Sequence, residues 1–201
     1  MARLSLSKSS LSKQSRQLKT YERFLPSLDL KRKQLMAERS KARAHLRDTE
    51  ESIETLRRRV GEALPMLANH EVELDALVRI REVRLGRENL VGTRLPVLEG
   101  VEVEVREYGL LAKPHWVDRV AMELTRMLEL QMALRVGRRR LELLEIAVRK
   151  VTQRVNLFEK VLIPQTRENI RRIRIALSDA ERAAVVRAKI AKGKRAKEGL
   201  A

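Results

Sequence analysis

Apolar residues recur at alternating steps of three and four through the C-terminal part of the chain. The stripe is formed by Met127, Leu130, Leu134, Leu141, Leu144, Val148, Val151, Val155, Phe158 and Leu162. About half of the residues between them are Arg, Glu or Lys. A seam with this spacing, sustained over five repeats, is typical of a coiled-coil helix with a left-handed supercoil. The pattern predicts a long helix over residues 115–192.

This seam contains one gap and one displacement. Gly137 occupies the only seam position without a large side chain. We expect it to allow close helix approach or to mark local compliance. After Leu162 the stripe resumes at Ile163, one residue out of step and beside Pro164. Because proline removes a helical hydrogen bond, we expect the helix to kink or overwind there.

The N-terminal part carries a weaker version of the same repeat. One heptad position is occupied by Leu4, Leu11, Leu18, Leu25, Leu46, Ile53, Val60 and Leu67. Arg32 and Arg39 interrupt it, and Pro26 lies within it. The repeat predicts one long, somewhat bent helix that runs from about Leu4 to Asn69, within residues 1–70.

Residues 71–114 have a different period. Val101, Val103 and Val105 alternate with charged residues, which is typical of a half-buried strand. Residues 77–85 are a candidate partner strand, and residues 86–96 carry turn residues. The predicted fold is therefore all-α: a long antiparallel, left-handed two-helix coiled coil with a small β-hairpin inserted between the helices. Residues 193–201 are expected to form a basic, flexible tail.

The composition supports a helical protein and excludes several kinds of protein and of binding site. The chain has 201 residues, of which 2% are aromatic, and it has no Cys. Disulfide frameworks and thiolate metal sites are excluded, and no apolar run approaches the roughly 18 residues of a membrane span. His45, His70 and His115 lack metal-ligand spacing. We predict no catalytic, cofactor-binding or metal site.

Charge points to an acidic partner. Lys and Arg number 44 against 27 Asp and Glu, a formal net charge of +17. From Arg187 to Ala201 there are six basic residues and one acidic residue, Glu198. Such a segment suits an acidic protein surface or nucleic acid. The aromatic side chains on which single-stranded nucleic acids stack are scarce, while a basic helix that binds duplexes stays possible.

The segment from Val151 to Pro164 resembles the signature of the D subunit, the central-stalk rotor of V-type and A-type rotary ATPases. The matching residues are Arg154, Val155, Asn156, Glu159, Ile163 and Pro164. Residues 88–92, residues 95–96 and residues 28–35 resemble further parts of that family. The similarity spans nearly the whole chain.

The resemblance implies a non-catalytic rotor shaft without cofactors. Its function would be to transmit torque between the catalytic A and B subunits and the membrane ring, and so to couple ATP hydrolysis or synthesis to hydrogen ion or other ion transport. Its partners would be the A and B subunits, the F subunit of the central stalk and the protein that joins the stalk to the membrane ring, with no nucleic acid and no membrane insertion. It would be cytoplasmic and peripheral to the membrane.

Two hypotheses about the basic charge follow. If the rotor interpretation holds, the inner surface of the catalytic ring is the expected contact of Arg187, Lys189, Lys192, Lys194 and Arg195. The alternative function is a basic coiled-coil scaffold or a nucleic-acid-binding protein. Salt-dependent DNA binding would favour this alternative, whereas assembly with a nucleotide-binding hexamer would favour the rotor.

Overall fold

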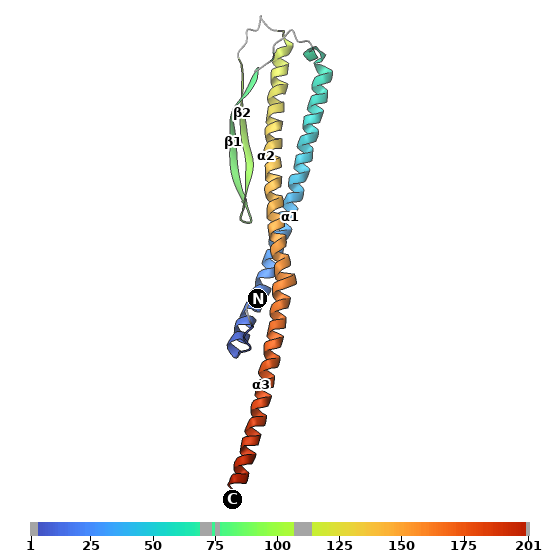
Figure 1. Cartoon of the computed structure of the whole chain (residues 1–201). Coiled ribbons are helices and arrows are strands. Elements are labelled where there is room, and N and C mark those ends of the chain that lie inside the picture. The colour runs from blue at the N-terminus through green and yellow to red at the C-terminus, as the bar shows by residue number, and fades with distance from the viewer. Residues whose placement is uncertain (1–3, 69–73, 75–76, 107–113, 200–201) are drawn as a thin grey trace. The chain divides into compact units, whose positions relative to one another are not determined.

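The structure is a computed structural model that describes residues 4–68, 74, 77–106 and 114–199 (Figure 1). Helix α1 spans Lys8–Ala63 and is followed by a short 3₁₀ helix, Pro65–Ala68. Strands β1, Val78–Leu90, and β2, Thr93–Val105, form a two-stranded antiparallel sheet. Helix α2, Trp116–Leu157, passes through a π-helical turn at Phe158–Leu162 into α3, Ile163–Glu198. The predicted class, a mostly helical chain with a hairpin between its helices, is confirmed.

The ends of the first helix follow from local chemistry. The hydroxyl oxygen of Ser7 accepts a hydrogen bond from the Ser10 amide at 3.2 Å, which caps the start of α1. The helix ends at Ala63, earlier than the predicted end near residue 69, because Leu64 precedes Pro65 and a residue before proline disfavours the helical conformation. Pro26 lies inside α1 without ending it.

The chain divides into two compact units, residues 1–30 with 151–201 and residues 31–150. In the second unit, ion pairs join α1 to α2: Arg43–Glu145 at 2.6 Å, Glu50–Arg138 at 3.0 Å and Arg59–Glu123 at 3.0 Å. As the residue number rises along α1 it falls along α2, so this pair of helices is antiparallel. Leu35 and Leu144 are fully buried in this unit.

The first unit packs the start of α1 against α3 and the π-helical turn. The ring of Tyr21 meets the ring of Phe158 edge-on, with centroids 5.4 Å apart. Glu22 pairs with Arg167 at 2.8 Å. The buried side chains of this unit include Val151, Val155, Ile163, Ile170 and Ile173.

The hairpin is longer than the sequence pattern indicated. Residues 86–96 were expected to be a connector with turn residues, but all of them except Val91 and Gly92 belong to the two strands. Val91 has φ 49° and Gly92 has φ 78°. Two consecutive positive φ values are typical of the two-residue type I′ turn, whose twist matches that of the flanking strands.

The displacement of the seam coincides with the π-helical turn, which is wider than an α-helical turn, so the expectation that the helix overwinds there is wrong. Val155 and Ile163 are both buried, yet they are eight residues apart instead of seven. The amide of Ile163 donates to the carbonyl of Phe158, five residues earlier. One wide turn thus absorbs one extra residue and keeps the apolar stripe in phase. Helical structure then continues to Glu198, beyond residue 193, where a flexible tail was expected.

Candidate functional site

The predicted seam residues lie on the inner side of their helix. Leu144, Val148, Val151 and Val155 are buried, and the remaining members are half-buried: Met127, Leu130, Leu134, Leu141, Phe158 and Leu162. Burial of aliphatic side chains along one stripe is the main stabilising contribution available to a paired helix.

Gly137 of α2 faces the side chain of Leu46 in α1. A Cβ atom at this position would be 3.2 Å from Cδ1 of Leu46, tighter than ordinary van der Waals contact. The absence of a side chain at Gly137 therefore leaves room for Leu46. This contact supports the first of the two explanations for the gap in the seam, close packing of the two helices.

The residues of the family signature surround the π-helical turn. Val155 is buried, whereas Arg154, Asn156, Glu159 and Pro164 are exposed. Pro164 follows the π-helical turn inside a continuous helical backbone, where it has no amide to donate to the preceding turn. Four of the five side chains are thus available to neighbours of this chain.

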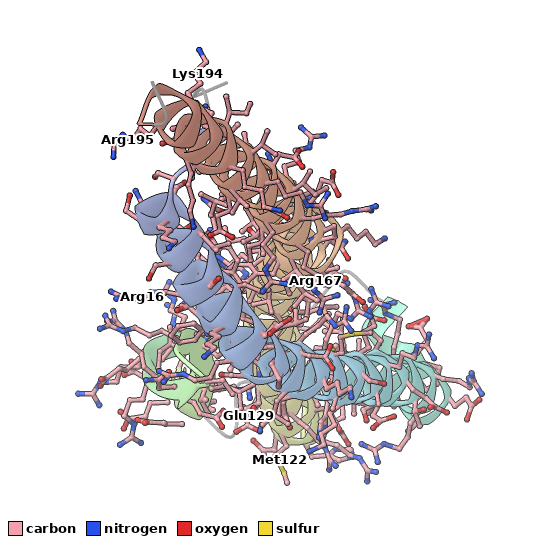
Figure 2. All side chains as sticks on the ribbon, turned by 90° about the horizontal axis from the view of Figure 1, so that it is seen from below. Arg16, Met122, Glu129, Arg167, Lys194 and Arg195 are labelled. Carbon is pink, nitrogen blue, oxygen red and sulfur yellow. The ribbon has the colours of Figure 1, made fainter. Side chains whose placement is uncertain are left out.

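The end of α3 carries the five basic residues assigned to a ring contact, and they are exposed: Arg187, Lys189, Lys192, Lys194 and Arg195. Every side chain from Asp179 to Arg195 is exposed. Figure 2 shows Lys194 and Arg195 pointing away from the helix. At about 100° per residue, the five charges point in several directions around the axis.

Most of the positive charge belongs to one unit. Residues 1–30 and 151–201 together hold 19 Lys and Arg residues against 7 Asp and Glu, or +12 of the total of +17. Residues 31–150 hold 25 against 20. The unit that contains the end of α3 is therefore the one that attracts anionic partners.

Arg140 has a role that sequence reasoning did not assign. It belongs to a run of three arginines at positions 138–140. Its Nη2 pairs with Oε2 of Glu88 in β1 at 2.7 Å, and its Nη1 donates to the carbonyl of Pro96 in β2 at 3.5 Å. Its side chain is only 22% exposed. One guanidinium group thus joins α2 to both strands, a contact between distant segments that heptad spacing does not indicate.

The remaining titratable groups form no metal site in the described part of the chain. His45 and His115 are exposed, and His70 lies outside the described residues. No group of three or more His, Cys, Asp or Glu residues that could hold a metal ion occurs among the residues described. Glu38 raises the pKa of Lys41 through a hydrogen bond and an ion pair at 2.8 Å. None of the described helices is both long and apolar enough to span a bilayer.

Comparison with known proteins decides the family. The model of the family described as the D subunit of ATP synthase matches residues 10–193. This chain belongs to that family. Among its relatives, the V-type ATP synthase D subunit of Borreliella burgdorferi is 32% identical over 192 residues, which cover 96% of this chain and 95% of the relative.

Two further relatives carry the same name. The V-type ATP synthase D subunit of Chlamydia muridarum is 32% identical over 196 residues, with 96% of each chain covered. That of Chlamydia felis is 31% identical over 198 residues, with 96% of this chain and 94% of the relative covered. As a member of the ATP synthase D-subunit family, the chain is related to subunits of a rotary, ion-translocating ATPase along nearly its whole length.

Proposed function

We propose that this chain is the non-catalytic central-stalk shaft of a V/A-type rotary ATPase. It transmits torque between the catalytic A and B subunits and the membrane ring, and so couples ATP hydrolysis or synthesis to ion transport. Its partners in this proposal are the A and B subunits, the F subunit of the central stalk and the protein that joins the stalk to the membrane ring. It acts in the cytoplasm, peripheral to the membrane.

Membership of the ATP synthase D-subunit family carries this proposal. Paired helices with an apolar seam support it, because such a seam resists twisting and bending. The active chemistry belongs to the A and B subunits in this assignment, while this chain changes their conformations in turn as it rotates.

We further propose that the end of α3 lies inside the catalytic ring. The supporting observation is that Arg187, Lys189, Lys192, Lys194 and Arg195 are exposed on several sides of one helix. A flat partner would contact only some of them, whereas a partner that surrounds the helix can contact all of them. Long-range attraction would centre the shaft without a fixed contact that stops rotation.

The first test of the function is co-purification. The tagged full-length chain is isolated from its own cells in mild detergent after nuclease treatment, and its partners are identified by mass spectrometry. Two large nucleotide-binding subunits and a small stalk protein, in fixed stoichiometry, are expected. If nuclease removed every partner, the chain would instead be a nucleic-acid-binding scaffold, and the rotor assignment would be wrong.

The ring contact has its own test. Replacement of all five basic residues by Gln should weaken assembly or the coupling of hydrolysis to ion transport, with an effect that changes with ionic strength. A matched control replaces five exposed basic residues of the other unit: Arg47, Arg58, Arg79, Arg81 and Arg119. Unchanged assembly and coupling in the first variant, at both low and high salt, would contradict the contact.

A further inference from the structure

The hairpin is held to the helices near both of its ends. At the end of the hairpin away from its turn, Leu77 is buried in a cluster with Leu64, Val117, Val120 and Ala121. The carbonyl of Leu77 also accepts a hydrogen bond from the Arg106 amide at 2.9 Å. Toward the turn, Leu95 is 1% exposed and its neighbour Pro96 accepts a hydrogen bond from Arg140.

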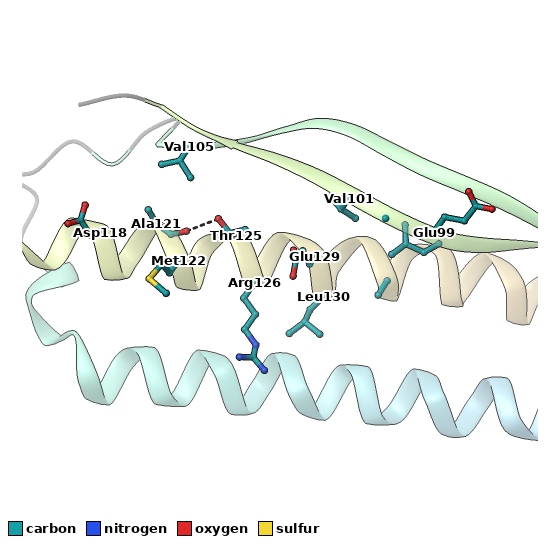
Figure 3. Close-up of a pocket in the computed structure, with 13 residues that line it drawn as sticks. Glu99, Val101, Val105, Asp118, Ala121, Met122, Thr125, Arg126, Glu129 and Leu130 are labelled. Carbon is teal, nitrogen blue, oxygen red and sulfur yellow. Dashed lines mark hydrogen bonds between the residues drawn. The ribbon is translucent and has the colours of Figure 1, made fainter. Parts of the chain in front are cut away.

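Between these two attachments an open groove separates β2 from α2 (Figure 3). Its volume is about 1060 Å³. Leu98, Val101 and Val105 line it from β2, while Ala121 and Met122 line it from α2. We call this space the β2–α2 groove.

Two apolar side chains of the groove are unusually open to solvent. Met122 is 73% exposed and Val105 is 43% exposed. Figure 2 shows Met122 pointing away from the ribbon. A thioether is flexible and polarizable, and adapts well to apolar surfaces of a partner. Exposed apolar groups around a preformed hollow are typical of an interaction site.

The surface around this groove is acidic, whereas the chain as a whole is basic. A second hollow, between α1 and α2, shares Arg126 and Leu130 with the groove, so the two form one continuous face. Five carboxylate residues line that face, Asp48, Glu51, Glu99, Asp118 and Glu129, and one of them, Asp118, already takes part in another interaction of the chain. The basic residues that line it are Arg59 and Arg126, and Arg59 pairs with Glu123. In a protein with a net charge of +17, this acidic face selects a basic partner.

We infer that the β2–α2 groove is a docking site for an amphipathic protein helix whose apolar side chains are flanked by Lys or Arg. The apolar side chains enter between Val101 and Met122, and the basic ones face Glu129 and the carboxylates of α1. Helices that dock in this way bind through apolar anchors one turn apart. Flanking charges set the orientation and exclude the wrong partners.

Two synthetic helical peptides test this inference on the full-length chain. Their leucine faces are identical, but one carries Lys and the other Glu at the flanking positions. Binding is followed by NMR of the methyl groups of isotope-labelled methionines. The Lys peptide is expected to shift the Met122 signal and to leave that of Met36, which is 43% exposed on α1 outside the groove, in place. The Glu peptide is expected to shift neither.

Charge-reversed variants make the test specific. Glu129→Lys should weaken binding of the Lys peptide about fivefold or more. The matched control Glu142→Lys, on the same helix but outside both hollows, should leave it unchanged. A net positive protein repels a cationic peptide in general, so preference for the Lys peptide can arise only from a local acidic surface.

Three results would overturn the inference: no shift of Met122 with the Lys peptide, equal shifts with both peptides, or a shift that depends on protein concentration alone. The last result would mean that a second copy of the chain occupies the groove. Because the experiment uses the isolated chain, its failure leaves the proposed rotor function untouched.

Discussion

At the scale of single residues, two glycines of one helix pair differ in what surrounds them. A Cβ at Gly61 would meet nothing within 4 Å, whereas one at Gly137 would lie 3.2 Å from Cδ1 of Leu46. Glycine in a helix interior is less stable than alanine by about 1 kcal/mol. At Gly137 the contact with Leu46 explains why glycine is present despite this loss of stability. At Gly61 nothing in the structure explains it.

Alanine substitution separates these two cases. Gly61→Ala should raise the free energy of unfolding by about 0.5–1 kcal/mol. Gly137→Ala should raise it less, because Leu46 must move, and Gly137→Leu should lower it by about 1–3 kcal/mol. Thermal and denaturant unfolding of the three variants measure these differences. Equal gains for the two alanine variants would contradict the close-approach explanation.

Arg140 offers a second comparison between neighbouring residues. Arg140→Ala removes the ion pair with Glu88 and the hydrogen bond to Pro96, both partly shielded from solvent, and should cost about 1–2 kcal/mol. Arg139 is 63% exposed and pairs with Glu142 one turn away, so Arg139→Ala should change stability by less than about 0.5 kcal/mol.

Amide hydrogen exchange locates the Arg140 effect. In Arg140→Ala the amides near the hairpin turn should exchange faster, while those near Leu77 should keep their rates because the cluster at that end is intact. Exchange near the hairpin turn that is as slow in Arg140→Ala as in the control Arg139→Ala would show that Arg140 does not attach the hairpin turn to α2.

At the scale of elements, the π-helical turn can be attributed either to Pro164 or to the extra residue in the seam. We attribute it to the extra residue, because Val155 and Ile163 are both buried only if one residue is absorbed between them. Deletion of the exposed Val161 together with Pro164→Ala should convert the turn to regular α-helix with little loss of stability.

Pro164→Ala alone should leave the π-helical turn in place. A control deletion of Gln131, also exposed, would displace the seam at Leu134, Leu141 and Leu144 and should cost at least about 3 kcal/mol. Crystal structures and unfolding measurements of the variants check these outcomes. A regular helix in the Pro164→Ala variant would assign the turn to the proline instead.

The end of α3 should matter for assembly and not for folding. From Asp179 to Arg195 its described side chains are exposed, so removal of residues 182–201 should change the free energy of unfolding by less than about 0.5 kcal/mol. Assembly with the catalytic subunits should be lost or weakened. A truncated chain that assembles normally would show that this segment serves only solubility.

Sequence periodicity predicted the helices better than the contacts between them. Apolar steps of three and four located the second helix and its displaced seam, since burial of one stripe imposes that spacing. The length of the hairpin escaped prediction because Gly86, Pro96 and Gly100 indicate turns locally, while strand pairing overrides them. The contacts of Arg140 and the β2–α2 groove join residues far apart in sequence, and no local pattern encodes such distances.

At the scale of the whole molecule, charge is divided unevenly between two surfaces with different roles. The unit that contains the end of α3 carries most of the positive charge, whereas the face around the β2–α2 groove is acidic. A single chain thereby offers one surface for anionic partners and another for a cationic one. This division suits a protein that must contact several different neighbours in a fixed order.

The most direct test of the shaft function uses the absence of Cys from this chain. A single Ile190→Cys substitution is combined with a Cys on the facing surface of one of the catalytic subunits in the purified complex, and oxidation forms a disulfide between them. The shaft proposal predicts that oxidation stops ATP hydrolysis and that reduction restores it. Sustained, ion-coupled hydrolysis in the fully cross-linked complex would contradict rotation of this chain.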